Sequence, residues 1–102
     1  MTSTKSNPKR LEWSHKALTD RQAIWNYIAI VENSPINASL VDARILASAV
    51  NLEIFPLLGK PFQQGLRLLF IPSTQLTIVY RALPHSVRIL RIAHQKKKSI
   101  QN

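Results

Sequence analysis

Residues 66–94 decide the fold, and they read LRLLFIPSTQLTIVYRALPHSVRILRIAH. Three runs rich in β-branched and aromatic residues, 66–71, 76–82 and 87–94, are separated by the four-residue gaps PSTQ and LPHS. These gaps are of hairpin length and contain residues typical of turns. The stretch therefore predicts three strands that form an antiparallel meander.

Two helices are expected before this meander. Apolar residues recur at three- and four-residue spacing over about 15–32, with Ser14 as a candidate N-cap, and again from Pro35 to about residue 54, with Ser34 as N-cap. The short connection ENSP favours antiparallel neighbours, so the pair forms a helical hairpin. The expected apolar stripes are Ala17, Ile24, Ile28 and Val31 on the first helix, and Ala38, Val41, Ile45, Ala49 and Leu52 on the second.

The order of elements predicts a single α+β domain over residues 10–94. A short strand with period-two alternation, RLEWS, precedes the helical hairpin, the meander follows it, and the helices pack on one face of the sheet. The segment FPLLGKPFQQG holds both glycines of the chain and reads as a loop. We expect residues 1–9 to be a flexible leader and 95–102 a basic tail. Neither a secretion signal nor a run of about 20 apolar residues is found, so a cytoplasmic location away from membranes is expected.

Alternation along the three expected strands sorts their side chains into two faces. An apolar set should pack on the helices: Leu66, Leu68, Phe70, Leu76, Ile78, Tyr80, Leu90 and Ile92. The other face then carries Arg67, Arg81 and Arg91, one arginine on each strand. No acidic residue follows Glu53, so these arginines are expected to lack local salt-bridge partners.

The net charge of +9 lies almost wholly in the second half of the chain, where residues 54–102 hold eight basic residues and no acidic one. A half of the chain that carries only positive charges favours a polyanionic or acidic partner. Lys60, Arg67, Arg81 and Arg91 are the candidate phosphate-binding or target-binding residues. The chain has no cysteine and its three histidines lack ligand-like spacing, so neither a metal nor another cofactor is expected.

Several motifs together resemble the RelE/ParE toxin superfamily, and more closely its ParE-like branch. Residues 55–71, FPLLGKPFQQGLRLLFI, are similar to the family's Phe-Pro, Gly-Lys/Arg-Pro and Gly-x-Arg pattern. IVYRA is similar to its Tyr-Arg strand, and VRILRIAH to its last strand, Ile-Leu-Arg-x-x-His. The resemblance extends from about Trp13 to His94. Members often continue with an aromatic-proline ending, where this chain reads QKKKSIQN.

This resemblance implies the toxin of a type II toxin–antitoxin system, held inactive by a cognate antitoxin. ParE-like members poison DNA gyrase, whereas RelE-like members cut mRNA on the ribosome. The resemblance favours a non-enzymatic gyrase poison, and a ribosome-dependent endoribonuclease is the alternative. The antitoxin is expected to be acidic where it meets the basic face, but the sequence does not indicate which groove it occupies.

His94 is the residue on which the ribonuclease alternative depends. Metal-independent RNA cleavage needs a base, an acid and cations, and histidine can act as base or acid near neutral pH. Phe62 stands where some ribonuclease members have a glutamate, and no tyrosine follows Tyr80. A structural role at the end of the last strand is therefore preferred for His94, with catalysis as the alternative.

Overall fold

The computed structural model describes residues 9–94, and the sequence-based expectations for residues 1–8 and 95–102 lie outside this range. The helical elements are α1 (His15–Asn26), a π-helical turn η2 (Tyr27–Val31), α2 (Pro35–Ile54) and a short 3₁₀ turn η3 (Gln63–Gly65). The strands are β1 (Arg10–Trp13), β2 (Lys60–Pro61), β3 (Arg67–Phe70), β4 (Leu76–Ala82) and β5 (Ser86–His94).

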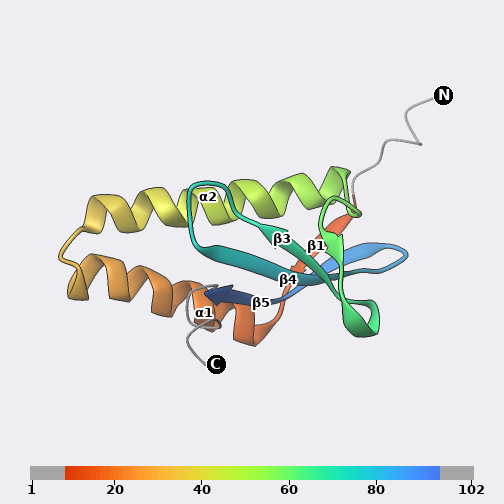
Figure 1. Cartoon of the computed structure of the whole chain (residues 1–102), viewed down its shortest axis with the longest axis horizontal. Coiled ribbons are helices and arrows are strands. Elements are labelled where there is room, and N and C mark those ends of the chain that lie inside the picture. The colour runs from red at the N-terminus through yellow and green to blue at the C-terminus, as the bar shows by residue number, and fades with distance from the viewer. Residues whose placement is uncertain (1–8, 95–102) are drawn as a thin grey trace.

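The strands form one mixed sheet of order β1-β5-β4-β3-β2 (Figure 1). β5, β4, β3 and β2 pair antiparallel, and β1 pairs parallel with β5. The α+β class, the N-terminal strand, the helical hairpin and the meander are thus confirmed. The loop prediction for 55–65 missed β2, which is a two-residue strand containing a proline and gives no periodic signal.

Both predicted N-caps are present. The hydroxyl of Ser14 accepts from the amide of Ala17 at 3.0 Å and donates to the carbonyl of Leu90 at 2.8 Å. It thereby fixes the start of α1 against the middle of β5. The hydroxyl of Ser34 caps α2 by accepting from the amide of Asn37 at 3.3 Å, and Pro35 occupies the first turn of the helix.

A salt bridge joins the two helices. Arg21 of α1 donates two hydrogen bonds to Asp42 of α2, at 3.0 and 3.1 Å. The guanidinium also lies 4.9 Å from the ring centroid of Trp13, at the end of β1. These contacts tie the helical hairpin to the edge of the sheet.

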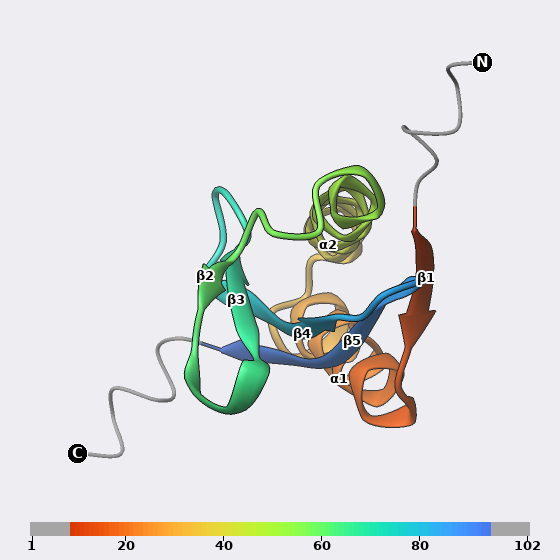
Figure 2. The ribbon, with the colours of Figure 1, turned by 90° about the vertical axis from the view of Figure 1, so that its right-hand side faces the viewer.

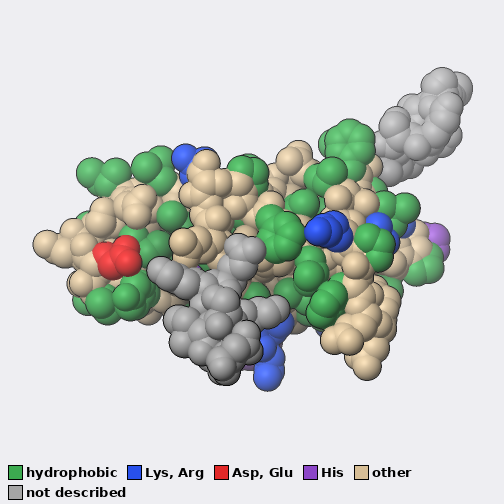
Figure 3. All heavy atoms as spheres, in the orientation of Figure 1, with side chains coloured by type: hydrophobic (Ala, Val, Ile, Leu, Met, Phe, Trp, Pro, Cys, Tyr) green, Lys and Arg blue, Asp and Glu red, His purple; other side chains and the backbone are tan. Residues whose placement is uncertain are grey.

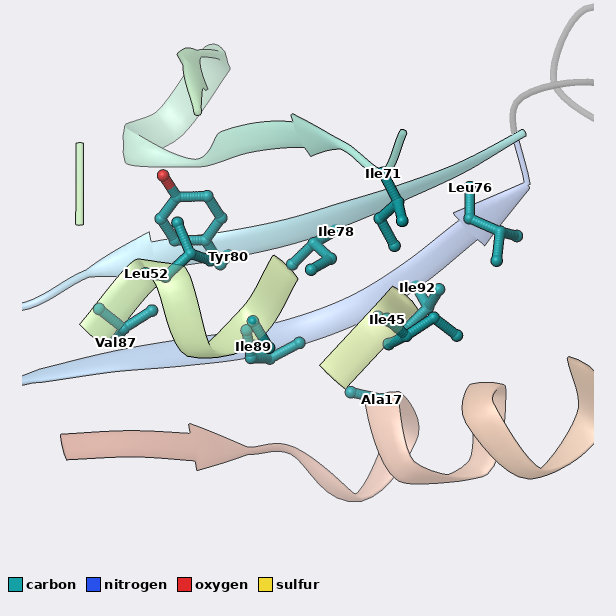
Figure 4. Close-up of a cluster of buried hydrophobic side chains, with 11 residues drawn as sticks. Ala17, Ile45, Leu52, Ile71, Leu76, Ile78, Tyr80, Val87, Ile89 and Ile92 are labelled. Atoms are coloured by element: carbon teal, nitrogen blue, oxygen red, sulfur yellow. The ribbon is translucent and has the colours of Figure 1, made fainter. Parts of the chain in front are cut away.

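The core lies between the helices and the sheet (Figures 2 and 4). It consists of Ala17, Ile45, Ala49, Leu52, Ile71, Leu76, Ile78, Tyr80, Val87, Ile89 and Ile92. The stripe predicted for the second helix is confirmed, with Val41 packed at the core's margin. The stripe predicted for the first helix fails at Val31, which is 67% exposed, whereas Ala29 is buried. A π-turn holds an extra residue and so rotates the side chains that follow it.

The pairing of the strands corrects the predicted faces. Arg67 pairs with Tyr80 and Leu69 with Ile78, so β3 directs Leu69 to the core and Phe70 outward. Val79 pairs with Arg91 but Tyr80 with Ile89, so β5 has a bulge at Leu90 and buries Ile89. The inward placement expected for Leu68, Phe70 and Leu90 is therefore wrong. Alternation shows which residues of one strand share a face, but it does not show which face of a neighbouring strand they share. A bulge also inserts one residue, so the side chains beyond it point to the opposite faces.

Within residues 9–94, no helix is both long and apolar enough to cross a membrane.

Candidate functional site

The loop between α2 and β3 is fastened to the sheet by Tyr80. This side chain is fully buried, and its hydroxyl donates to the carbonyl of Pro56 at 2.8 Å and accepts from the amide of Gly59 at 2.8 Å. A Cβ on Gly59 would lie 2.7 Å from the carbonyl oxygen of Leu68 and 2.8 Å from the Tyr80 ring. Only glycine lets the loop approach β3 and β4 this closely.

Arg67 holds the same loop from β3. Its guanidinium donates to the carbonyls of Gly59, at 3.1 Å, and Leu57, at 3.3 Å. Because Arg67 pairs with Tyr80, it lies on the opposite face of the sheet from Arg81, which contradicts the expected face of three arginines. The structure thus gives Arg67 a role in positioning the loop.

Lys60 stands on the outer side of this loop, in the edge strand β2. It pairs with Leu68, which places it on the outer face of the sheet, and its ammonium lies 5.7 Å from the ring centroid of Phe70. Phe70 is 45% exposed and Phe62 beside the strand is 44% exposed. Hydrophobic and basic side chains are accordingly intermingled on this face (Figure 3). Such a mixture suits a partner that offers both apolar groups and negative charge.

Two further arginines are neighbours on the outer face. Arg81 of β4 pairs across strands with Arg88 of β5, and Arg88 forms a 3.2 Å salt bridge with Glu12 of β1. Arg81 donates to the backbone carbonyl of Gln64 in η3. The backbone carbonyl of Gln64 therefore holds the Arg81 side chain in place without neutralising its positive charge.

Arg91 is held by a carboxylate that the sequence did not suggest. It donates two hydrogen bonds to Asp20 of α1, at 2.9 and 3.1 Å, and Asp20 also accepts from the amide of Ile92 at 2.8 Å. These hydrogen bonds, and then the carboxylate's charge, raise the pKa of Arg91 above its ordinary value. Asp20 is 71 residues from Arg91 along the chain, so the prediction that Arg67, Arg81 and Arg91 lack local salt-bridge partners did not anticipate this distant one.

Replacing Asp20 with alanine is expected to lower the free energy of unfolding by about 1–2 kcal/mol. The variant loses the hydrogen bonds to Arg91 and leaves the amide of Ile92, which is partly buried, without this acceptor. Urea denaturation followed by circular dichroism measures the change. Glu32→Ala is the matched control, because Glu32 is exposed, and its effect should stay within about 0.5 kcal/mol. Equal stability of the two variants would contradict the role of Asp20.

His94 lies at the rim of a groove of about 980 Å³ between the helical hairpin and the end of the sheet. Arg91, Asp20 and Glu32 line the same groove, together with Ser73 and Thr74 of the β3–β4 turn. Folding brings two carboxylates to the groove, one of which already binds Arg91. Within residues 9–94, no cluster of histidine, aspartate and glutamate side chains could hold a metal ion.

A family model identifies the family of this chain. The family model described as the ParE toxin of the type II toxin–antitoxin system parDE matches residues 11–98. No curated protein matches the sequence.

Solved structures of toxin–antitoxin systems are similar in fold. A chain of the chromosomal ParDE system of P. aeruginosa is 25% identical, with a TM-score of 0.75, and the match covers 87% of this chain and 98% of that one. A chain of the RelBE2 complex of Mycobacterium tuberculosis is 21% identical, with a TM-score of 0.63, covering 85% and 91%. A chain of the E. coli DinJ-YafQ complex is 16% identical, with a TM-score of 0.54, covering 88% and 96%.

Proposed function

This chain belongs to the ParE toxin family of type II toxin–antitoxin systems, and we propose that it arrests growth by poisoning DNA gyrase. It does so in the bacterial cytoplasm when its cognate antitoxin is lost. The match to the ParE toxin model over residues 11–98 is the observation that carries this proposal. The likeness to a ParDE chain over almost its whole length supports the same branch.

The outer face of the sheet is proposed to meet the target. Lys60 and Arg81 make no salt bridge among residues 9–94, so their charges are available for DNA phosphates or for carboxylates of gyrase. Arg67 and Arg91 help to position this surface, because the guanidinium of each donates hydrogen bonds to other groups of the chain. The exposed rings of Phe62 and Phe70 add apolar area between the charges.

A ribosome-dependent endoribonuclease is the second candidate, and one observation favours it. His94, Arg91 and Glu32 line one groove, which provides a possible base or acid, a cation and a carboxylate. Against it, the phenol of Tyr80 is buried and engaged with the loop, so it cannot reach a substrate as a proton donor.

A supercoiling assay tests the proposal. The purified chain is expected to abolish supercoiling of relaxed plasmid by gyrase or to accumulate cleaved plasmid, and added antitoxin should reverse the effect. A Lys60→Ala/Arg81→Ala variant should be much weaker at equal concentration. Lys16→Ala/Arg44→Ala is the matched control, since it removes two exposed charges from the helices. Unaffected gyrase together with cuts in ribosome-bound mRNA would overturn the gyrase assignment.

Replacing His94 with alanine distinguishes the two candidates. A gyrase poison should keep most of its activity, because within residues 9–94 the His94 side chain makes no hydrogen bond and is exposed where it lines the groove. A nuclease that uses His94 as base or acid should lose roughly 10²–10⁴-fold in cleavage rate. The rate of growth arrest after induction and the cleavage rate on programmed ribosomes measure the two outcomes.

A further inference from the structure

Two arginines stand directly opposite each other on neighbouring strands of the outer face. Arg81 of β4 pairs with Arg88 of β5 in the antiparallel ladder, so their Cβ atoms lie about 5 Å apart. Ala82 packs at the core's margin and Val87 is fully buried, which turns both arginines to the opposite face, away from the helices. Like charges in this arrangement destabilise a sheet. A bound anion would remove that repulsion.

The side chain of Arg81 is held by a turn with an unusual backbone. Its guanidinium donates to the carbonyl of Gln64 in η3. Gln64 has a φ of 59° and Gly65 a φ of 77°, so two consecutive residues are left-handed, which is unfavourable for Gln64 because it has a Cβ. A Cβ on Gly65 would lie 2.9 Å from a terminal nitrogen of Arg81, so the guanidinium lies against the turn. This contact orients the guanidinium before any ligand binds.

Arg88 is oriented from the other side by a carboxylate. One of its terminal nitrogens donates to Glu12 of β1 at 3.2 Å, and the side chain of Arg88 remains 49% exposed. A guanidinium has five N–H donors. Within residues 9–94, Arg81 and Arg88 each give one hydrogen bond to the protein. Their remaining donors are free to bind the oxygens of one tetrahedral anion from two sides.

The bulge in β5 adds a third positive charge to the same face. Arg88 and Arg91 are three residues apart, a spacing that places side chains on opposite faces of a regular strand. The bulge at Leu90 inserts one residue between them, so both arginines point outward. Arg91 is 52% exposed even though it binds a carboxylate. Three arginines of two adjacent strands therefore share this face, and their two carboxylate partners leave it with a net positive charge.

We propose that Arg81 and Arg88 form a binding site for one phosphate of a nucleic-acid backbone, with Arg91 adding positive charge beside it. A phosphate diester fits because its two free oxygens share one negative charge and can each accept from a guanidinium. The naming of duplex DNA as the source rests on the proposed action at gyrase. The phosphate contact itself is a property of the free chain.

Binding to DNA without gyrase tests the site. Fluorescence anisotropy of a short labelled duplex, titrated with the full chain, should give a saturable curve. Arg88→Ala should weaken binding about tenfold, because a charged hydrogen bond to phosphate is lost. It should also lower the slope of log affinity against log salt by about 0.9, the share of one phosphate.

Arg44→Ala is the matched control for Arg88→Ala. It removes one exposed arginine from α2, so the net charge changes by the same amount. Charges more than about 10 Å from the ligand are largely screened at an ionic strength of about 0.1 M. The control should therefore change the affinity less than about twofold in this buffer. Equal losses for Arg44→Ala and Arg88→Ala would overturn the proposal.

Two variants of one salt bridge separate phosphate binding from a structural role. Arg88→Ala and Glu12→Gln both break the ion pair between β1 and β5. If Arg88 only joined these strands, both variants would lower DNA affinity alike, and that result would overturn the proposal. If Arg88 binds phosphate, Glu12→Gln should keep or raise the affinity, because it removes a negative charge from the face.

A double variant tests whether the two side chains share one phosphate. Arg81→Ala and Arg88→Ala should each cost about tenfold in affinity, and the double variant should cost clearly less than the product of about 100-fold. The reason is that one remaining arginine no longer clamps the phosphate from both sides. Losses that simply multiply, with the circular dichroism spectrum unchanged, would overturn the shared site.

The failure of this site and the failure of the gyrase proposal give different results. A chain that binds the duplex through Arg88 but leaves gyrase active would overturn the gyrase proposal and support the site. A chain that inhibits gyrase while Arg88→Ala binds the duplex equally well would overturn the site alone. Binding through Arg88 to single-stranded RNA, with none to the duplex, would overturn DNA as the source of the phosphate.

Discussion

Replacing Tyr80 with alanine is expected to lower the free energy of unfolding by about 3–5 kcal/mol. Tyr80 is the largest fully buried side chain of the core, so its removal leaves a cavity between α2 and the sheet. The same change removes the hydroxyl that fastens Gly59 and Pro56. The loop that carries Lys60 then loses its main anchor, so target inhibition should fall together with stability.

Tyr80→Phe separates these two contributions. The ring still fills the core, but the amide of Gly59 loses its acceptor in a buried place, which should cost about 1–3 kcal/mol. Chemical denaturation of both variants measures the difference. The control is Tyr27→Phe, in which the hydroxyl is removed from a side chain that is 54% exposed, with an expected change within about 0.5 kcal/mol. A Tyr80→Phe variant as stable as this control would contradict the anchoring role.

Gly59→Ala is expected to cost about 3 kcal/mol, at the upper end of what an added methyl group does in a packed site. The new Cβ would meet the carbonyl oxygen of Leu68 and the ring of Tyr80, both closer than 3 Å. Neither neighbour can move without disturbing the sheet, because one is strand backbone and the other is a buried ring. The expected structural result is a displaced β2, detectable as loss of amide exchange protection around Lys60–Phe62.

Gly65→Ala provides the matched comparison at the other glycine of the chain. Gly65 has a φ of +77°, so alanine there costs about 1 kcal/mol from the backbone alone. Its Cβ would lie 2.9 Å from the end of the Arg81 side chain, which is long and can swing away. Gly59→Ala should therefore destabilise more than Gly65→Ala, and the reverse order would contradict the close packing of the loop.

The sequence predicted which basic residues belong to the candidate site, but it predicted only part of their arrangement in space. The excess of basic residues after Glu53 is a property of the sequence, and the structure does place Lys60 and Arg81 on the outer face. Arg67 could not be placed correctly, because its orientation depends on pairing with Tyr80 across a hairpin. The partners of Arg88 and Arg91 could not be found either, since Glu12 and Asp20 are more than 70 residues away along the chain.

The sequence by itself determined the elements and their order. Helix caps, apolar periodicity and turn residues act over a few neighbouring positions, which is why Ser14, Ser34 and the two hairpin gaps could be read directly. Only the tertiary structure decided the parallel pairing of β1 with β5, the bulge at Leu90 and the anchoring of the loop by Tyr80. These depend on register and on contacts between distant segments, where one residue of shift reverses the face of a side chain and leaves the local pattern unchanged.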